Sequence, residues 1–170
     1  MLDARAPSRT GAEDTDQAGR SRASINGHPI HPMLVPLPIA AFLFLLATDV
    51  GFWLTADPFW ARASLWLVGV GVVTGALAGA VGAVDFWAVP QARRHGAGWV
   101  HAIGNVAALL ASVVNWGFRA GDPVGAVLPW GLVLSVVVAG LLAVTGWAGG
   151  ELSYRYRVGV IPHAGVQRGS

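Results

Sequence analysis

The sequence predicts an all-α membrane protein: a polytopic, up-down bundle of four transmembrane helices with both termini in the cytoplasm. Of its 170 residues, 54% are apolar and only 12% are charged, whereas about 25% of the residues are charged in an ordinary soluble domain. The apolar residues gather in four runs of about 20 or more, the length that a bilayer-spanning helix needs. Arginines gather on one set of connecting segments, which predicts the orientation of the bundle.

The segments follow in a simple order along the chain. Residues 1–25 are polar and contain no apolar run, so they are predicted to be a disordered tail. A four-helix transmembrane domain is predicted over residues 26–161, and a short tail over 162–170. Because backbone polar groups in lipid must be satisfied internally, each apolar run should be a helix, and the short connections make successive helices neighbours. The predicted spans are 34–54, 63–89, 98–118 and 126–149.

Arginine placement sets the predicted orientation. With four spans, the N-terminal tail, the second loop and the C-terminal tail share one side of the membrane. That side carries nine arginines, and the other side carries only Arg62 and Arg119. Positive residues favour the cytoplasmic side, so we expect a multi-pass protein of the inner (plasma) membrane. The nine are Arg5, Arg9, Arg20, Arg22, Arg93, Arg94, Arg155, Arg157 and Arg168.

The overall charge and the glycines suggest partners. The sequence pI is about 9.9, and with this hydropathy we attribute it to arginines facing anionic lipid rather than to nucleic acid. Gly71, Gly75 and Gly79 recur at four-residue spacing in the second span. Small residues at this spacing let helix backbones approach closely. We expect tight packing inside the bundle, and the same face is the predicted contact of a homo-oligomer.

Polar residues gather near the predicted cytoplasmic boundary of all four spans. In the stretch GHPIHPMLVPLPIA, two histidines each precede a proline, which disfavours the α conformation. A polyproline strap would place His28 and His31 on one face, roughly 9 Å apart at the backbone. Ionisable groups in a membrane are costly and therefore mark functional sites. The predicted cluster contains His28, His31, Asp85, His101, Asn105 and Glu151.

A second polar layer is predicted near the outer face. Asp49 lies in the first span and Asn115 in the third, each roughly 24–26 Å from the cytoplasmic start of its span. We expect a hydrogen bond between them that locks the helices, rather than a transport site.

These residues resemble a bacterial membrane family called domain of unknown function 2231. The similarity covers about residues 26–161 and includes GHPIHPMLVPLPIA, GAVDFWAV, HAIGN and GGELSYRYRVGV. Members of the family are similar four-helix membrane proteins, some of them fused to Rieske-type or cytochrome c domains, so the resemblance implies membrane electron transfer. Relatives often have histidine where this chain has Tyr156. The matching positions are His28, His31, Asp85, His101, Asn105, Gly149, Gly150 and Glu151.

The leading functional hypothesis is a haem b-binding or other redox membrane module. A four-helix bundle is a common host for haem held by imidazoles from facing elements. The favoured axial pair is His31 with His101, and His28 is the alternative to His31. Asn105 or Asp85 would orient an imidazole through its second nitrogen. The chain has no cysteine, so covalent c-type attachment is excluded.

Three other hypotheses remain open. A divalent metal could bind to histidines and carboxylates without haem. A structural or assembly subunit would carry no cofactor. A proton or solute carrier fits less well, because transporters usually place polar groups at mid-membrane. Nothing points to a substrate, so no independent catalytic activity is predicted. The ligands of the metal hypothesis are His28, His31, His101, Asp85 and Glu151.

Overall fold

The computed structural model describes residues 21–26, 28–156 and 158. It contains four helical segments long and apolar enough to cross a membrane, which confirms the predicted multi-pass helical architecture. All four differ from the predicted spans at both ends, and most of the helix ends extend into the residues that flank the apolar runs. The four segments are Ile30–Thr55, Pro58–Ala88, Gly96–Gly121 and Val127–Tyr154.

The first membrane segment is preceded by a small antiparallel strand pair. Strand β1 (Ser24–Ile25) pairs with β2 (His28–Pro29). The predicted disordered tail ended at residue 25, but the structure describes residues 21–25 as an ordered approach to the bundle. The predicted tails 1–20 and 162–170 lie outside the described residues.

The predicted polyproline strap is wrong at His31. Residue Pro29 is extended, with φ −61° and ψ 128°, but helix α2 (Ile30–Leu34) already includes His31. Proline is tolerated in a first turn because its missing N–H would have no partner there, so Pro32 does not prevent the helix. Helix α3 (Pro36–Thr55) continues from α2 through Val35, whose backbone is also helical.

Helix α4 (Pro58–Ala88) begins five residues before the predicted span. Ala56 reverses the chain with a left-handed φ of 54°. The carboxylate of Asp57 then accepts a hydrogen bond from the backbone N–H of Phe59 at 2.9 Å, and Pro58 takes the first helical position, where it suits the geometry. Helices α3 and α4 pack along their length; with α2 they form the first helix pair.

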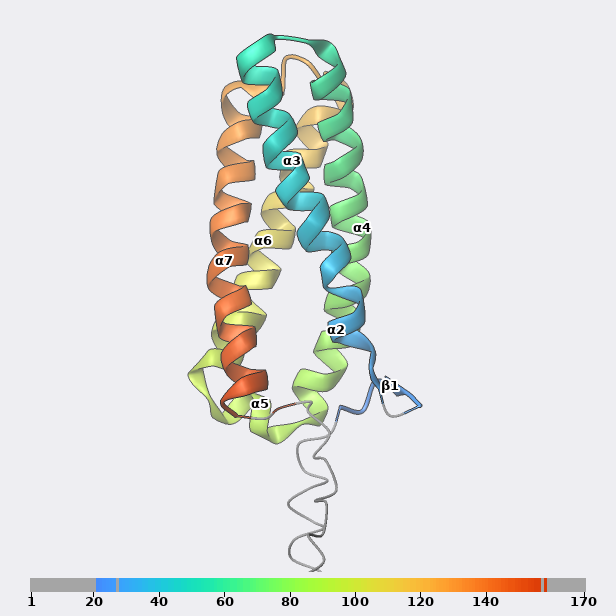
Figure 1. Cartoon of the computed structure of the whole chain (residues 1–170), viewed down its shortest axis with the longest axis vertical. Coiled ribbons are helices and arrows are strands. Elements are labelled where there is room, and N and C mark those ends of the chain that lie inside the picture. Colours follow the sequence, from blue (N-terminus) through green and yellow to red (C-terminus); the bar gives the residue numbers. More distant parts are fainter. Residues whose placement is uncertain (1–20, 27, 157, 159–170) are drawn as a thin grey trace, which may run out of the picture.

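The second helix pair consists of α6 (Gly96–Gly121) and α7 (Leu132–Tyr154). A short helix α5 (Pro90–Arg94) leads into α6, and the kinked segment η1 (Val127–Gly131), in which Leu128 is extended, leads into α7. Figure 1 shows the α3–α4 connection and the α6–α7 loop at the upper end of the bundle, and α5 and β1 at the lower end.

An apolar core joins the two helix pairs at mid-height. Gly71 serves this core, because a Cβ at residue 71 would collide with the ring of Phe42, and a Cβ at Gly75 would touch Leu109. Two of the three predicted packing glycines therefore pack against other residues of the chain, whereas a Cβ at Gly79 would have no atom within 4 Å. A homo-oligomer through this face stays a prediction. The core cluster is Phe42, Leu45, Val68, Val72 and Val138.

Candidate functional site

Two imidazoles from different helix pairs meet at the lower end of the bundle. His31 lies in α2 and His101 in the second turn of α6. Their ring centroids are 6.1 Å apart and their planes are almost perpendicular, at 86°. Both side chains are half-buried. We call these two residues the histidine pair.

The ring of His31 is fixed by the backbone of α4. Its Nδ1 lies 2.8 Å from the carbonyl oxygen of Ala78. A carbonyl can only accept a hydrogen bond, so Nδ1 is the donor, and in the neutral ring the lone pair is on Nε2. One turn further along α4, the missing side chain of Gly82 leaves room for the ring, since a Cβ at that position would lie 2.8 Å from both Cε1 and Nδ1.

The ring of His101 has the same environment on α7. Its Nδ1 donates to the carbonyl oxygen of Thr145 at 2.9 Å. Four residues later, a Cβ at Gly149 would lie 2.9 Å from Cε1 and from Nδ1. The two helix pairs thus each supply one histidine with the same tautomer, the same carbonyl anchor and the same glycine contact.

The remaining predicted ligands do not join the histidine pair. His28 is exposed, and its Nδ1 contacts the carbonyl oxygen of Asn26 at 3.2 Å. Asn105 donates to the backbone carbonyl of His101 at 2.7 Å and accepts from the hydroxyl of Thr145. It therefore supports the helix that carries His101, and its described hydrogen bonds go to the backbone and to Thr145 rather than to an imidazole ring.

The two carboxylates have other partners. Asp85 accepts hydrogen bonds from the hydroxyl of Ser21 at 2.7 Å and from the backbone N–H groups of Arg22 and Ala23. It therefore holds the segment that precedes β1 rather than an imidazole. Glu151 pairs with Arg155 one turn away, at 2.8 Å.

The predicted five-ligand metal cluster is therefore not assembled. Among residues 21–26, 28–156 and 158, no three histidine, cysteine or acidic side chains form a group that could hold a metal ion. Tyr156 stacks on His95 with ring centroids 3.7 Å apart.

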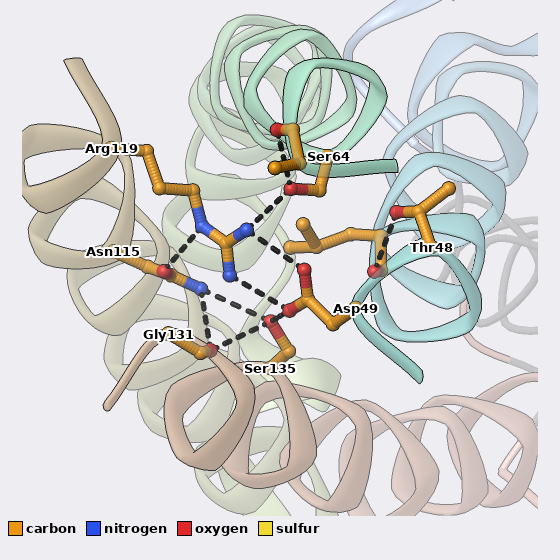
Figure 2. Close-up of polar contacts among 9 residues, drawn as sticks. Thr48, Asp49, Ser64, Asn115, Arg119, Gly131 and Ser135 are labelled. Atoms are coloured by element: carbon orange, nitrogen blue, oxygen red, sulfur yellow. Dashed lines mark hydrogen bonds and ion pairs between the residues drawn. The ribbon is translucent and has the colours of Figure 1, made fainter. Parts of the chain in front are cut away.

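A buried ion pair joins the four helices at the other end of the bundle. Two guanidinium nitrogens of Arg119 lie 2.8 and 2.7 Å from the two carboxylate oxygens of Asp49, and both side chains are fully buried. Arg119 also donates to the hydroxyl of Ser64 and, at 2.8 Å, to the side-chain oxygen of Asn115. Figure 2 shows these side chains pointing toward one another from the four helices.

The rest of this ion-pair network is equally satisfied. The hydroxyl of Ser135 donates to Asp49 at 2.6 Å, and Asn115 donates to Ser135 and to the carbonyl oxygen of Gly131 (Figure 2). Asp49 and Asn115 lie in one network as predicted, but they are linked through Arg119 and Ser135 rather than by the direct hydrogen bond that we expected.

Sequence reasoning missed Arg119, which it assigned to an external loop. Two signals were available. Arg119 and Asn115 lie four residues apart and so share one face of α6. Asp49 follows His31 by 18 residues and Arg119 follows His101 by the same 18, which places both charges at one depth on corresponding helices, about 27 Å from the histidines.

The two ends of the bundle differ in what they can do chemically. In the ion-pair network, every side chain is fully buried and is hydrogen-bonded within the protein. These side chains are therefore already engaged and do not present atoms to a ligand. The described hydrogen bonds of the histidine pair use only the Nδ1 atoms, so both Nε2 atoms are left without a described partner, and the pair is partly accessible. Of the two polar layers, only the histidine pair therefore presents free donor atoms to a cofactor.

The comparisons with known proteins identify a family, and the description of that family names no activity. The family model described as "Predicted membrane protein (DUF2231)" matches residues 27–162, which is most of the chain. No curated protein and no solved structure matches this chain. With its four membrane-length helices, the chain belongs to the DUF2231 family of membrane proteins.

Proposed function

We propose that this protein binds one haem b between its two helix pairs, with His31 and His101 as axial ligands, and that it transfers electrons in the plasma membrane. The observation that carries the proposal is the convergence of two imidazoles, one from each helix pair, with centroids 6.1 Å apart. Bound there, haem b would supply a one-electron redox centre.

The donor set fits haem better than a bare metal ion. Structural zinc sites need four protein ligands and catalytic zinc sites three, but no group of three such ligands forms in the described part of the chain. Haem brings its four equatorial nitrogens, so the protein needs to supply only the two axial positions. The histidine pair meets that requirement without any further residue.

The separation of the rings also favours axial coordination. With metal–nitrogen bonds of about 2 Å, imidazoles on opposite sides of one iron have centroids about 6 Å apart, whereas tetrahedral coordination brings them to about 5 Å. The observed 6.1 Å matches the first arrangement. The Nδ1–H donated to a backbone carbonyl is the usual second contact of a metal-bound histidine, because it fixes the tautomer and orients the ring.

The arrangement in the membrane is part of the proposal. An up-down bundle with cytoplasmic termini would place the histidine pair near the cytoplasmic face, since α2 and α6 begin on that side. The arginine bias supports this orientation. A redox partner would then approach from the cytoplasm or from the inner leaflet, and the lipid bilayer would surround the helices.

One purification tests the proposal. The protein is expressed with added haem precursor, purified in detergent, and examined by absorption spectroscopy, pyridine haemochrome assay and elemental analysis. We expect a Soret band and one haem b per chain. Protein that contains no haem and takes up none from added haemin would overturn the proposal and leave the structural subunit. Zinc or copper in place of iron would favour the metal hypothesis.

A further inference from the structure

We propose that Gly82 and Gly149 are positioning residues that hold the two imidazole planes perpendicular and thereby set the electronic state of the bound iron. The inference rests on the proposed haem site, and its test is arranged so that the two can fail separately. It assigns a role to two glycines and two backbone carbonyls that bind no cofactor themselves.

Each histidine ring is held by one hydrogen bond and by one close glycine contact. For His31, Nδ1 donates to Ala78, and Nδ1 and Cε1 face Gly82; a Cβ on Gly82 would lie 2.8 Å from both atoms and 3.4 Å from Nε2. Nε2, bonded to Cε1, is the most distant of these three ring atoms from Gly82. Rotation of the ring about its own bonds would break the hydrogen bond or strike the α4 backbone.

The second ring is held in the same way on the other helix pair. Nδ1 of His101 donates to Thr145, and both Nδ1 and Cε1 would lie 2.9 Å from a Cβ at Gly149. Since α4 fixes one plane and α7 fixes the other, the 86° between them is set by how the two helix pairs cross. Ligand binding at the Nε2 atoms leaves both anchors intact.

The angle between the planes matters to the iron. Each axial imidazole donates π density into the iron d orbital perpendicular to its plane. Parallel planes raise one of two such orbitals and separate their energies, whereas perpendicular planes raise both alike and leave them nearly equal. A nearly equal pair gives low-spin ferric iron a very anisotropic electron paramagnetic resonance (EPR) spectrum, dominated by one low-field feature. Ligand orientation of this kind is among the means by which a protein tunes haem.

The test compares EPR spectra of the oxidised holoprotein and of glycine variants. We expect the wild-type spectrum to show the dominant low-field feature. Gly82→Ala and Gly149→Ala each place a methyl group where the ring edge now lies, so they should tilt one ring and convert the signal into a resolved rhombic spectrum, or expel the haem. Haem content is measured in the same samples by the pyridine haemochrome assay.

Matched controls exist one turn away on the same helices. Gly79 in α4 and Gly146 in α7 have no atom within 4 Å of a Cβ position. Gly79→Ala and Gly146→Ala change helix propensity as the test variants do, by about 1 kcal/mol in favour of the helix, but they do not touch a histidine. Both should keep full haem content and the wild-type spectrum.

The outcomes separate the two proposals. If wild-type protein holds no haem, the proposed function fails. If it holds haem but shows a resolved rhombic spectrum, the haem site stands and the perpendicular arrangement is wrong. If Gly82→Ala and Gly149→Ala leave both spectrum and haem content unchanged, or if the control variants change them as strongly, the positioning role of the glycines is overturned.

Discussion

Arg119 of α6 and Asp49 of α3 form a bidentate ion pair in the interior of the bundle, with nitrogen–oxygen distances of 2.8 and 2.7 Å. The pair joins the two helix pairs and distinguishes them, because one carries the carboxylate and the other the guanidinium. The histidine pair lacks this asymmetry, since both of its halves are alike. Two copies of the first helix pair would bring Asp49 against Asp49, so the charges favour the pairing of unlike halves.

Replacing one partner of this ion pair should destabilise the protein more than replacing both partners. Arg119→Met leaves the carboxylate of Asp49 buried without its cation, which we expect to lower the free energy of unfolding by about 3–5 kcal/mol. The double variant Asp49→Leu/Arg119→Met removes both charges. Ser64, Ser135 and Asn115 then keep their described bonds to the carbonyl oxygens of Ala61 and Gly131, so the double variant should be more stable than the single one.

Equilibrium unfolding in mixed micelles with increasing dodecyl sulfate measures these free energies. Arg62→Met, which removes an exposed arginine of α4, serves as the control for loss of a positive charge and should change stability by less than about 1 kcal/mol. A double variant less stable than Arg119→Met would show that the unpaired carboxylate of Asp49 is not what mainly destabilises the single variant.

Asp85 is expected to anchor the segment before β1. Asp85→Ala removes the acceptor of three hydrogen bonds from Ser21, Arg22 and Ala23. Bonds to a charged acceptor contribute about 1.5–3 kcal/mol each, so local release of this segment should raise the rate of tryptic cleavage after Arg22 by about tenfold or more. Mass spectrometry of timed digests in detergent measures that rate.

Glu151 provides the matched control for this measurement. Its carboxylate pairs with Arg155 at the surface, so Glu151→Ala should leave cleavage after Arg22 at the wild-type rate. Equal rates for wild type and Asp85→Ala would show that the described contacts do not restrain the segment.

The orientation of the bundle is open to direct measurement. We expect fusions after residue 156 to fluoresce when they carry green fluorescent protein and to be inactive when they carry alkaline phosphatase, because the C-terminus should be cytoplasmic. Fusions after residue 124, in the loop between α6 and η1, should behave in the opposite way. An active phosphatase at the C-terminus would invert the bundle and move the histidine pair to the outer face.

The sequence predicts the parts of this fold that depend on local composition. Four long apolar runs specify four helices whatever their neighbours are. The convergence of His31 and His101 was also predictable, because both lie at the start of odd-numbered spans and therefore at the same end. The hydrogen bonds that anchor these rings were not predictable, because their acceptors are the backbone carbonyls of Ala78 and Thr145. Every residue type has such a carbonyl.

Arg119 shows where local reasoning fails. A charged residue at the end of an apolar run is most simply placed at the membrane surface. Its burial depends on Asp49, 70 residues earlier, and on hydroxyls from two further helices. The helical state of His31 is a second case: a following proline disfavours the α conformation, but the missing N–H of Pro32 costs nothing in the first turn of α2.

The central claim is that His31 and His101 together hold a haem, and a set of three alanine variants tests it most directly. The measurement is haem b per purified chain after expression with haem precursor. His31→Ala and His101→Ala should each lose most of the haem, because each removes one of two axial ligands from different helix pairs. His28→Ala, three residues from His31 but exposed, should retain one haem per chain. Haem retained by both His31→Ala and His101→Ala, or lost equally in His28→Ala, would contradict the account.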